Sequence, residues 1–146
     1  MLHRLRAHLA ARRLARRQAA VTLDAARARV QRGAAVLDER DPGWHARISP
    51  ATLELADGQA CVLGQLHGDY RLGLGRARVL DFSSAPIASL SPVDLGFQAN
   101  ADLGEAIEAL DYAFLTRAWR EAIRERSVSV GSDPIRAREV GPPAQA

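Results

Sequence analysis

The chain has 146 residues, of which 47% are apolar, and a net charge of +3 at pH 7, values that suit one domain with a hydrophobic core. It lacks the run of about 20 apolar residues that a membrane span requires and the apolar core of a secretory signal, so we expect a cytoplasmic protein with no membrane partner. The single cysteine, Cys61, excludes an intramolecular disulfide and a cysteine-based zinc site, and we expect no metal and no cofactor.

Ala, Leu and Val supply most of the apolar residues, whereas aromatic residues make up only 5% of the chain. This composition favours helices that pack through aliphatic side chains. We predict a mainly α fold, a small helical domain of about three to four main helices with irregular connectors, an Arg-rich N-terminal helix and a disordered C-terminal tail. The expected boundaries are residues 1–20 for the arm, 21–126 for the helical core and 127–146 for the tail.

The N-terminal arm concentrates the positive charge of the chain. Residues 1–20 contain six Arg and no acidic residue, so the remaining 126 residues carry a net charge of −3. They contain no Gly or Pro, which favours a helix. On that helix Leu2, Leu5 and Leu9 lie on the same side as four arginines further along, so this side changes from apolar to cationic midway. A membrane-surface helix would keep its apolar and basic faces separate along its whole length, so the pattern argues against one. The six arginines are Arg4, Arg6, Arg12, Arg13, Arg16 and Arg17.

These arginines can neutralise several phosphates and so bind DNA or RNA without reading its sequence. The arm has no aromatic residue on which bases stack, so binding would use the nucleic-acid backbone alone. Two other interpretations stay open: a solvated helix in a chain whose basic residues are all Arg, and a helix that docks on acidic residues of a partner protein.

A second helix is expected from Thr22, as N-cap, to about Glu39, followed by a turn at residues 41–43. Its predicted core positions are Leu23, Ala26, Val30, Ala34 and Leu37, and its predicted outward arginines are Arg27, Arg29 and Arg32. Residues 44–55 read as a short irregular connector.

One buried helix is expected from Ala60 to about Leu74, with Leu63, Leu66 and Tyr70 at helical spacing. Gly64 and Gly68 would lie on one side of it. Because Gly in a helix interior costs up to about 1 kcal/mol relative to Ala, we expect another backbone or a ligand to approach there. The polar residues of this segment form a candidate contact surface for a partner protein or for self-association: Gly64, Gln65, His67, Gly68 and Asp69.

From residue 81 to 100 the composition shifts to Ser, Pro and Gly, with a helical turn in which Ser91 and Asp94 suit a capping box that Gly96 ends. The last helix is expected to open at Asp102 and Glu105. Its buried stripe is Tyr112, Leu115, Trp119 and Ile123, and its water-facing residues are Arg117, Arg120, Glu121, Arg124 and Glu125.

The run from Cys61 to Tyr70, Cys-Val-Leu-Gly-Gln-Leu-His-Gly-Asp-Tyr, resembles a segment of small actinobacterial and phage proteins that have no assigned activity. Their Gly-Trp pair, Ile-rich stretch and C-terminal helix are matched here by Gly43-Trp44, by Ile48 with Leu53 and Leu55, and by residues 115–123. The resemblance spans about residues 30–126 and implies a phage or mobile-element connection, with no catalytic residues.

Cys61 would lie near a helix N-terminus, where the dipole can lower the pKa of a thiol and activate it. His67 and Asp69 are close in sequence, but six helical positions place His67 about 9 Å away along the axis. A buried structural cysteine is the simpler interpretation. We therefore expect a non-enzymatic binding protein with weak nucleic-acid affinity in its arm, and keep as alternatives a protein–protein adaptor or assembly component and a thiol enzyme that uses Cys61.

Overall fold

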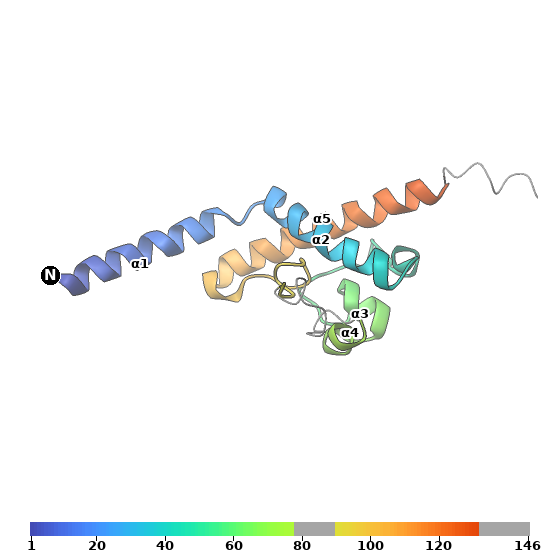
Figure 1. Ribbon diagram of the computed structural model, residues 1–146, viewed down its shortest axis with the longest axis horizontal. Helices are drawn as coiled ribbons and strands as arrows, with labels where there is room; N and C mark the ends of the chain where they lie inside the picture. Colours follow the sequence, from blue (N-terminus) through green and yellow to red (C-terminus); the bar gives the residue numbers. More distant parts are fainter. Residues whose placement is uncertain (78–89, 132–146) are drawn as a thin grey trace, which may run out of the picture.

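The computed structural model describes residues 1–77 and 90–131, and within these ranges the fold is mainly helical, as expected, and contains no strand (Figure 1). The α-helices are α1 (Leu2–Ala19), α2 (Leu23–Arg40), α3 (Val62–His67), α4 (Tyr70–Arg76) and α5 (Glu105–Gly131). Two short 3-10 helices, η1 (Trp44–Arg47) and η3 (Ala101–Leu103), join them. None of the described helices is long and apolar enough to cross a membrane.

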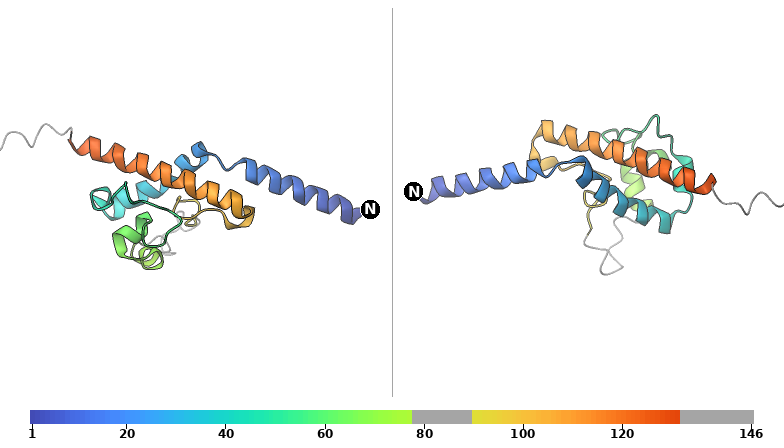
Figure 2. Two further views of the ribbon diagram at one scale, coloured as in Figure 1. Left: turned by 180° about the vertical axis from the view of Figure 1, so that it is seen from behind. Right: turned by 90° about the horizontal axis from the view of Figure 1, so that it is seen from above.

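Helices α2 and α5 pack side by side and form the centre of the core (Figures 1 and 2). Of the predicted α2 positions, Ala26, Val30, Ala34 and Leu37 are buried and Leu23 is half-buried. On α5 the predicted stripe is confirmed at Leu115, Trp119 and Ile123, while Tyr112 is half-buried. The predicted N-cap is also confirmed, since Thr22 Oγ1 accepts a hydrogen bond from Ala25 N at 3.1 Å, a contact that typically contributes about 1 kcal/mol.

Trp119 lies at the middle of the core. Its ring stacks on Phe97 at 5.2 Å between centroids and meets Trp44 edge-on at 5.6 Å. Its Nε1 donates to Gly96 O at 2.7 Å, so the only polar atom of the buried indole is paired. The connector 44–55 and the segment 95–97 are thereby attached to the α2–α5 pair.

The single helix expected from Ala60 to Leu74 is wrong, because the chain forms two short helices there. Gly68 ends α3 with a φ of 91°, a conformation that Gly adopts without a Cβ clash. Asp69 then caps α4, its side chain accepting from Arg71 N at 2.8 Å and Leu72 N at 3.4 Å. A Cβ at Gly73 would lie 2.6 Å from Leu63 Cβ, so α3 and α4 pack more closely than side chains at both positions would allow.

The segment before α5 folds as predicted at its helical turn, although residues 81–89 lie outside the described residues. Ser91 N donates to Asp94 Oδ2 at 2.9 Å, and Asp94 N donates to Ser91 Oγ at 3.2 Å, which is the reciprocal pair of a capping box. Gly96 ends the turn with a φ of 72°.

The last helix begins at one of its two predicted opening residues and ends later than expected. It begins at Glu105, because Ala101–Leu103 form the separate η3 and Gly104 follows with a φ of 93°. It continues through residues 127–131, which were predicted to belong to the disordered tail. In this last stretch Ser127 Oγ donates to Ile123 O at 2.9 Å and Ser129 Oγ donates to Glu125 O at 3.0 Å. The rest of the expected tail, residues 132–146, lies outside the described residues.

Candidate nucleic-acid interface on the N-terminal helix

Helix α1 projects from the body of the molecule, roughly parallel to α5 but displaced to one side, and extends beyond the N-terminus of α5 (Figures 1 and 2). None of its residues is buried. Its attachment lies at its C-terminal end, next to η3, where Gln18 Nε2 donates to Leu103 O at 2.9 Å. At 18 residues it exceeds the roughly 12–15 residues at which a helix becomes marginal in water, and Arg16 and Arg17 in its last turn complement the helix dipole.

Five of the six arm arginines lie on one side of α1. At about 100° per residue, Arg6, Arg12, Arg13, Arg16 and Arg17 fall within a sector of about 140°, with Arg4 outside it. No arm arginine forms an ion pair with any residue in the described ranges. The arm therefore presents guanidinium groups whose charges no nearby carboxylate neutralises.

The leucines of α1, like its arginines, are exposed. The exposed fractions are 73% for Leu2, 56% for Leu5, 46% for Leu9 and 40% for Leu14. A shallow hollow on the surface of the helix is lined by side chains of both kinds: Arg6, Leu9, Ala10, Arg13, Leu14 and Arg17. The arm thus combines cationic and apolar groups on a surface that no described part of the chain covers.

The structure brings the five predicted contact residues together on α3 and its C-terminal turn, but gives several of them roles within the chain. Gly64 is buried, and a Cβ there would lie 2.4 Å from Gly58 O and 2.6 Å from Gln59 O, so the approaching backbone belongs to this chain. Gln65 accepts from Ser49 N at 2.8 Å and donates to Ala60 O at 3.0 Å. The exposed Gly68 and the cap Asp69 form the turn between α3 and α4.

His67 lies on the same turn with its Nε2 buried and without a hydrogen-bond partner among the described residues. Burial lowers the pKa of His67, Arg76 and Arg47 lower it further, and the carboxylate of Asp41 opposes the shift. The imidazole is therefore held in its neutral form more strongly than in an unfolded chain.

Cys61 is 2% exposed and is the N-cap residue of α3. Its Sγ accepts from Gly64 N at 3.3 Å and lies 3.7 Å from Gly58 O. Burial raises the pKa of the thiol, the opposite of the activation that a helix N-terminus can give. The position favours a structural cysteine, because the thiolate that a nucleophile needs is suppressed.

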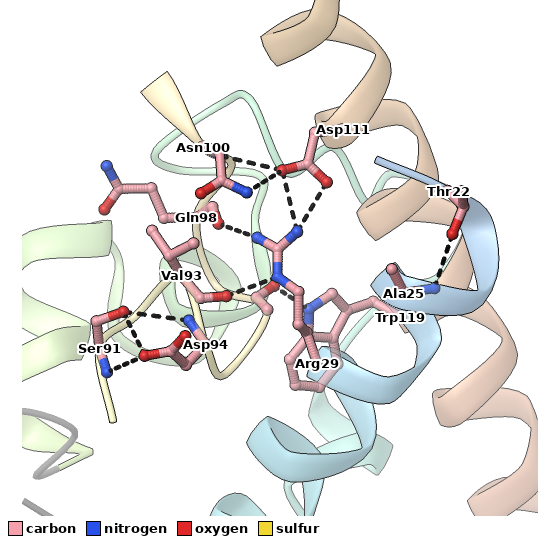
Figure 3. A network of polar contacts seen from close by, with 11 residues as sticks. Thr22, Ala25, Arg29, Ser91, Val93, Asp94, Gln98, Asn100, Asp111 and Trp119 are labelled. Atoms are coloured by element: carbon pink, nitrogen blue, oxygen red, sulfur yellow. Dashed lines mark hydrogen bonds and ion pairs between the residues drawn. The ribbon is translucent and has the colours of Figure 1, made fainter. Parts of the chain in front are cut away.

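The structure also shows a buried ion pair that the sequence reasoning missed. Arg29, expected to face outward, turns into the core, where Nη1 bonds both carboxylate oxygens of Asp111 at 2.8 and 3.0 Å (Figure 3). Its other nitrogens donate to Val93 O and Gln98 O, each at 2.7 Å. Asp111 precedes Leu115 by four residues, so an acid in register with the apolar stripe was the available signal.

A groove of about 580 Å³ runs along the N-terminal half of α5, and we call it the α5 groove. It is lined by Glu54, Ala56, Glu105, Glu108, Ala109, Tyr112, Ala113, Thr116 and Arg120. Its second wall is fixed to α5 by hydrogen bonds, because Arg120 donates to Pro50 O at 3.0 Å and Leu53 O at 2.8 Å, and Thr116 Oγ1 accepts from Leu55 N at 3.0 Å. Arg120, expected to face water, thus holds this wall in place.

Among the described residues there is no group of three or more His, Cys, Asp or Glu side chains that could hold a metal ion. Comparisons with known proteins found no match to this chain among protein-family models, curated proteins or solved structures.

Proposed function

We propose that this is a cytoplasmic, non-enzymatic binding protein that binds DNA or RNA weakly through the phosphates, using α1 as its binding arm. The observation that supports this most directly is the exposed sector of five arginines on α1, without an acidic residue in the helix and without an ion pair to the described residues. The resemblance of the Cys61–Tyr70 segment adds a phage or mobile-element origin to the proposal.

Each guanidinium can donate two parallel hydrogen bonds to one phosphate, and each neutralised phosphate releases counterions. The logarithm of the binding constant should then fall with the logarithm of salt concentration, with a slope of about −0.9 per phosphate contacted on duplex DNA. Because α1 has no aromatic residue, affinity should depend little on base sequence.

The test compares two full-length variants with the same change in charge. In the arm variant, Arg12, Arg13 and Arg16 become Gln, which keeps helix propensity nearly unchanged. In the control, Arg71, Arg76 and Arg124 become Gln; all three are exposed in the core domain. Fluorescence anisotropy with a labelled duplex should show a salt slope flatter by about 3 for the arm variant. Equal slopes for the wild type and the arm variant would refute the proposal.

A protein–protein adaptor or assembly component is the second candidate, because Leu2, Leu5 and Leu9 are exposed on one side of a projecting helix. Apolar side chains gathered on one surface commonly mark a protein interface. Light scattering should then show self-association that weakens when Leu5 and Leu9 are replaced by Gln. A monomer at every concentration, for wild type and variant alike, would exclude self-association.

A further inference from the structure

We infer that α1 of one molecule docks in the α5 groove of a second copy, and reciprocally, so that two chains form an arm-exchanged dimer with two-fold symmetry. This goes beyond nucleic-acid binding, since it gives the arm a protein partner and makes the groove a site. Three properties of the chain carry the inference: the matched chemistry of arm and groove, their matched lengths, and the direction in which α1 leaves the body.

The groove has the chemistry that the arm lacks. Glu105 and Glu108 line the groove at the N-terminal end of α5, and Glu54 lies on the opposite wall. Between them lie the small residues Ala109, Ala113 and Thr116 of α5 and Ala56 of the other wall, and Tyr112 and Arg120 also line the groove. Small residues let a second helix approach closely, and the carboxylates can pair with guanidinium groups at the rim.

The order of residues along the arm specifies one orientation in the groove. Its N-terminal half carries Leu2, Leu5 and Leu9, and its C-terminal half carries four arginines. Placed antiparallel to α5, the arginines reach Glu105 and Glu108 while the leucines cover the small apolar lining. Arg6 then comes to the level of Glu54. The antiparallel arrangement also sets the two helix dipoles in opposition, which is the favourable orientation.

The arm and the α5 groove are similar in length. Helix α1 has 18 residues and is about 27 Å long, and the α5 residues that line the groove, from Glu105 to Arg120, span about 24 Å. The groove wall is already held by the Arg120 and Thr116 hydrogen bonds, so docking requires no rearrangement of the core.

The direction of the arm selects a second copy as the partner. Helix α1 runs in about the same direction as α5, displaced to one side of it, and extends beyond the N-terminus of α5 (Figure 1). A two-fold axis near the start of α5 and perpendicular to it places each arm antiparallel along the α5 of the other copy. The two arm–groove contacts are then identical, and the assembly is complete with two chains.

Charge supports the same exchange. Residues 1–20 carry six positive charges and the rest of the chain a net charge of −3, so each arm is attracted to the body of the other molecule. Docking also covers leucines that the single chain leaves exposed. The arginines that would contact phosphate also contact the groove, so nucleic acid and dimer compete for the arm.

The experiment uses two full-length variants, purified separately and free of nucleic acid, in analytical ultracentrifugation at low salt. One variant, Glu105→Arg with Glu108→Arg, reverses the groove; the other, Arg13→Glu with Arg16→Glu, reverses the arm. We expect a dimer for the wild type and a dimer dissociation constant raised by about 100-fold or more for each variant, because like charges then face each other. Glu39→Arg with Glu125→Arg, both exposed outside the groove, is the charge-matched control and should stay dimeric.

Mixing the two weakened variants decides the case. Each reversed arm can then enter a reversed groove, and each native arm a native groove, so a heterodimer should form from two monomers. An arm that folds back on its own molecule cannot give this result. A monomeric wild type, a mixture that stays monomeric, or a groove variant that dimerises as well as the wild type would each overturn the inference. Without nucleic acid present, none of these results bears on the salt-dependent binding proposed above.

Discussion

Arg29 and Asp111 lie 82 positions apart in the sequence and form the most buried ion pair among the described residues, with exposed side-chain fractions of 12% and 2%. The pair joins α2 to α5, and Arg29 also holds the segment between them through Val93 O and Gln98 O. Asp111 Oδ2 accepts in addition from Asn100 N at 3.0 Å. Every charge in this group is thus matched by hydrogen bonds, which is the condition under which a buried ion pair is tolerated.

Removing one partner of this pair should destabilise the fold strongly. Arg29→Met leaves the carboxylate of Asp111 buried without its counter-charge, a situation that costs about 3–5 kcal/mol in other proteins. We expect a loss of this size in the free energy of unfolding, measured by urea denaturation. Arg32→Met is the control, since Arg32 is exposed on the same helix and bonds only Asp94 O in the described structure. A loss below about 1 kcal/mol for Arg29→Met would contradict the role of the pair.

The 90–100 segment packs tightly against α2 at Gly33. A Cβ there would lie 2.0 Å from Leu95 O and 3.2 Å from the Trp119 ring. Gly33→Ala should therefore destabilise the protein by about 2 kcal/mol or more, as overpacking does. Gly75→Ala, in α4 with open space around the position, should be neutral or stabilising, by up to about 1 kcal/mol. Thermal unfolding of both variants checks the prediction, and equal melting temperatures would disprove it.

Stability should fall as the pH is lowered through the ordinary pKa of histidine, 6.5. Burial lowers the pKa of His67 in the folded state, so below pH 6.5 the unfolded chain binds more protons than the folded one. Its contribution is complete above pH 6.5 and is lost as the pH falls toward the depressed folded value. Urea denaturation between pH 8 and about 5 should show this loss. His67→Asn should flatten that part of the curve; an unchanged slope would show that His67 is not responsible.

Cys61 should react slowly in the folded protein. Its thiol is buried and its pKa is raised, so the fraction of thiolate at neutral pH is small. Iodoacetamide should label native Cys61 at least about tenfold more slowly than the urea-unfolded chain, followed by mass spectrometry. Rapid labelling of the native protein would revive the thiol-enzyme alternative. Cys61→Ser should keep the α3 cap, because a hydroxyl can accept from Gly64 N as Sγ does.

The elements that were correctly predicted depend on residues close together in the sequence. The Thr22 cap and the Ser91–Asp94 pair each arise within about one helical turn, and the buried stripe of α2 repeats at helical spacing over about three turns. The break at Gly68 was missed because Leu63, Leu66 and Tyr70 keep helical spacing across it. A positive φ at one residue leaves no mark on the periodicity of its neighbours.

The sequence by itself determined the helical character of the chain and the separation of its positive charge into residues 1–20, since both follow from residue type and local order. Only the tertiary structure decided that Arg29 turns inward, because its acceptors on α5 and on residues 93–98 are distant in the chain. The same holds for the α5 groove, whose walls come from residues 54–56 and from α5. Contacts between distant residues depend on how the elements pack, and this packing is not contained in the periodicity of any one of them.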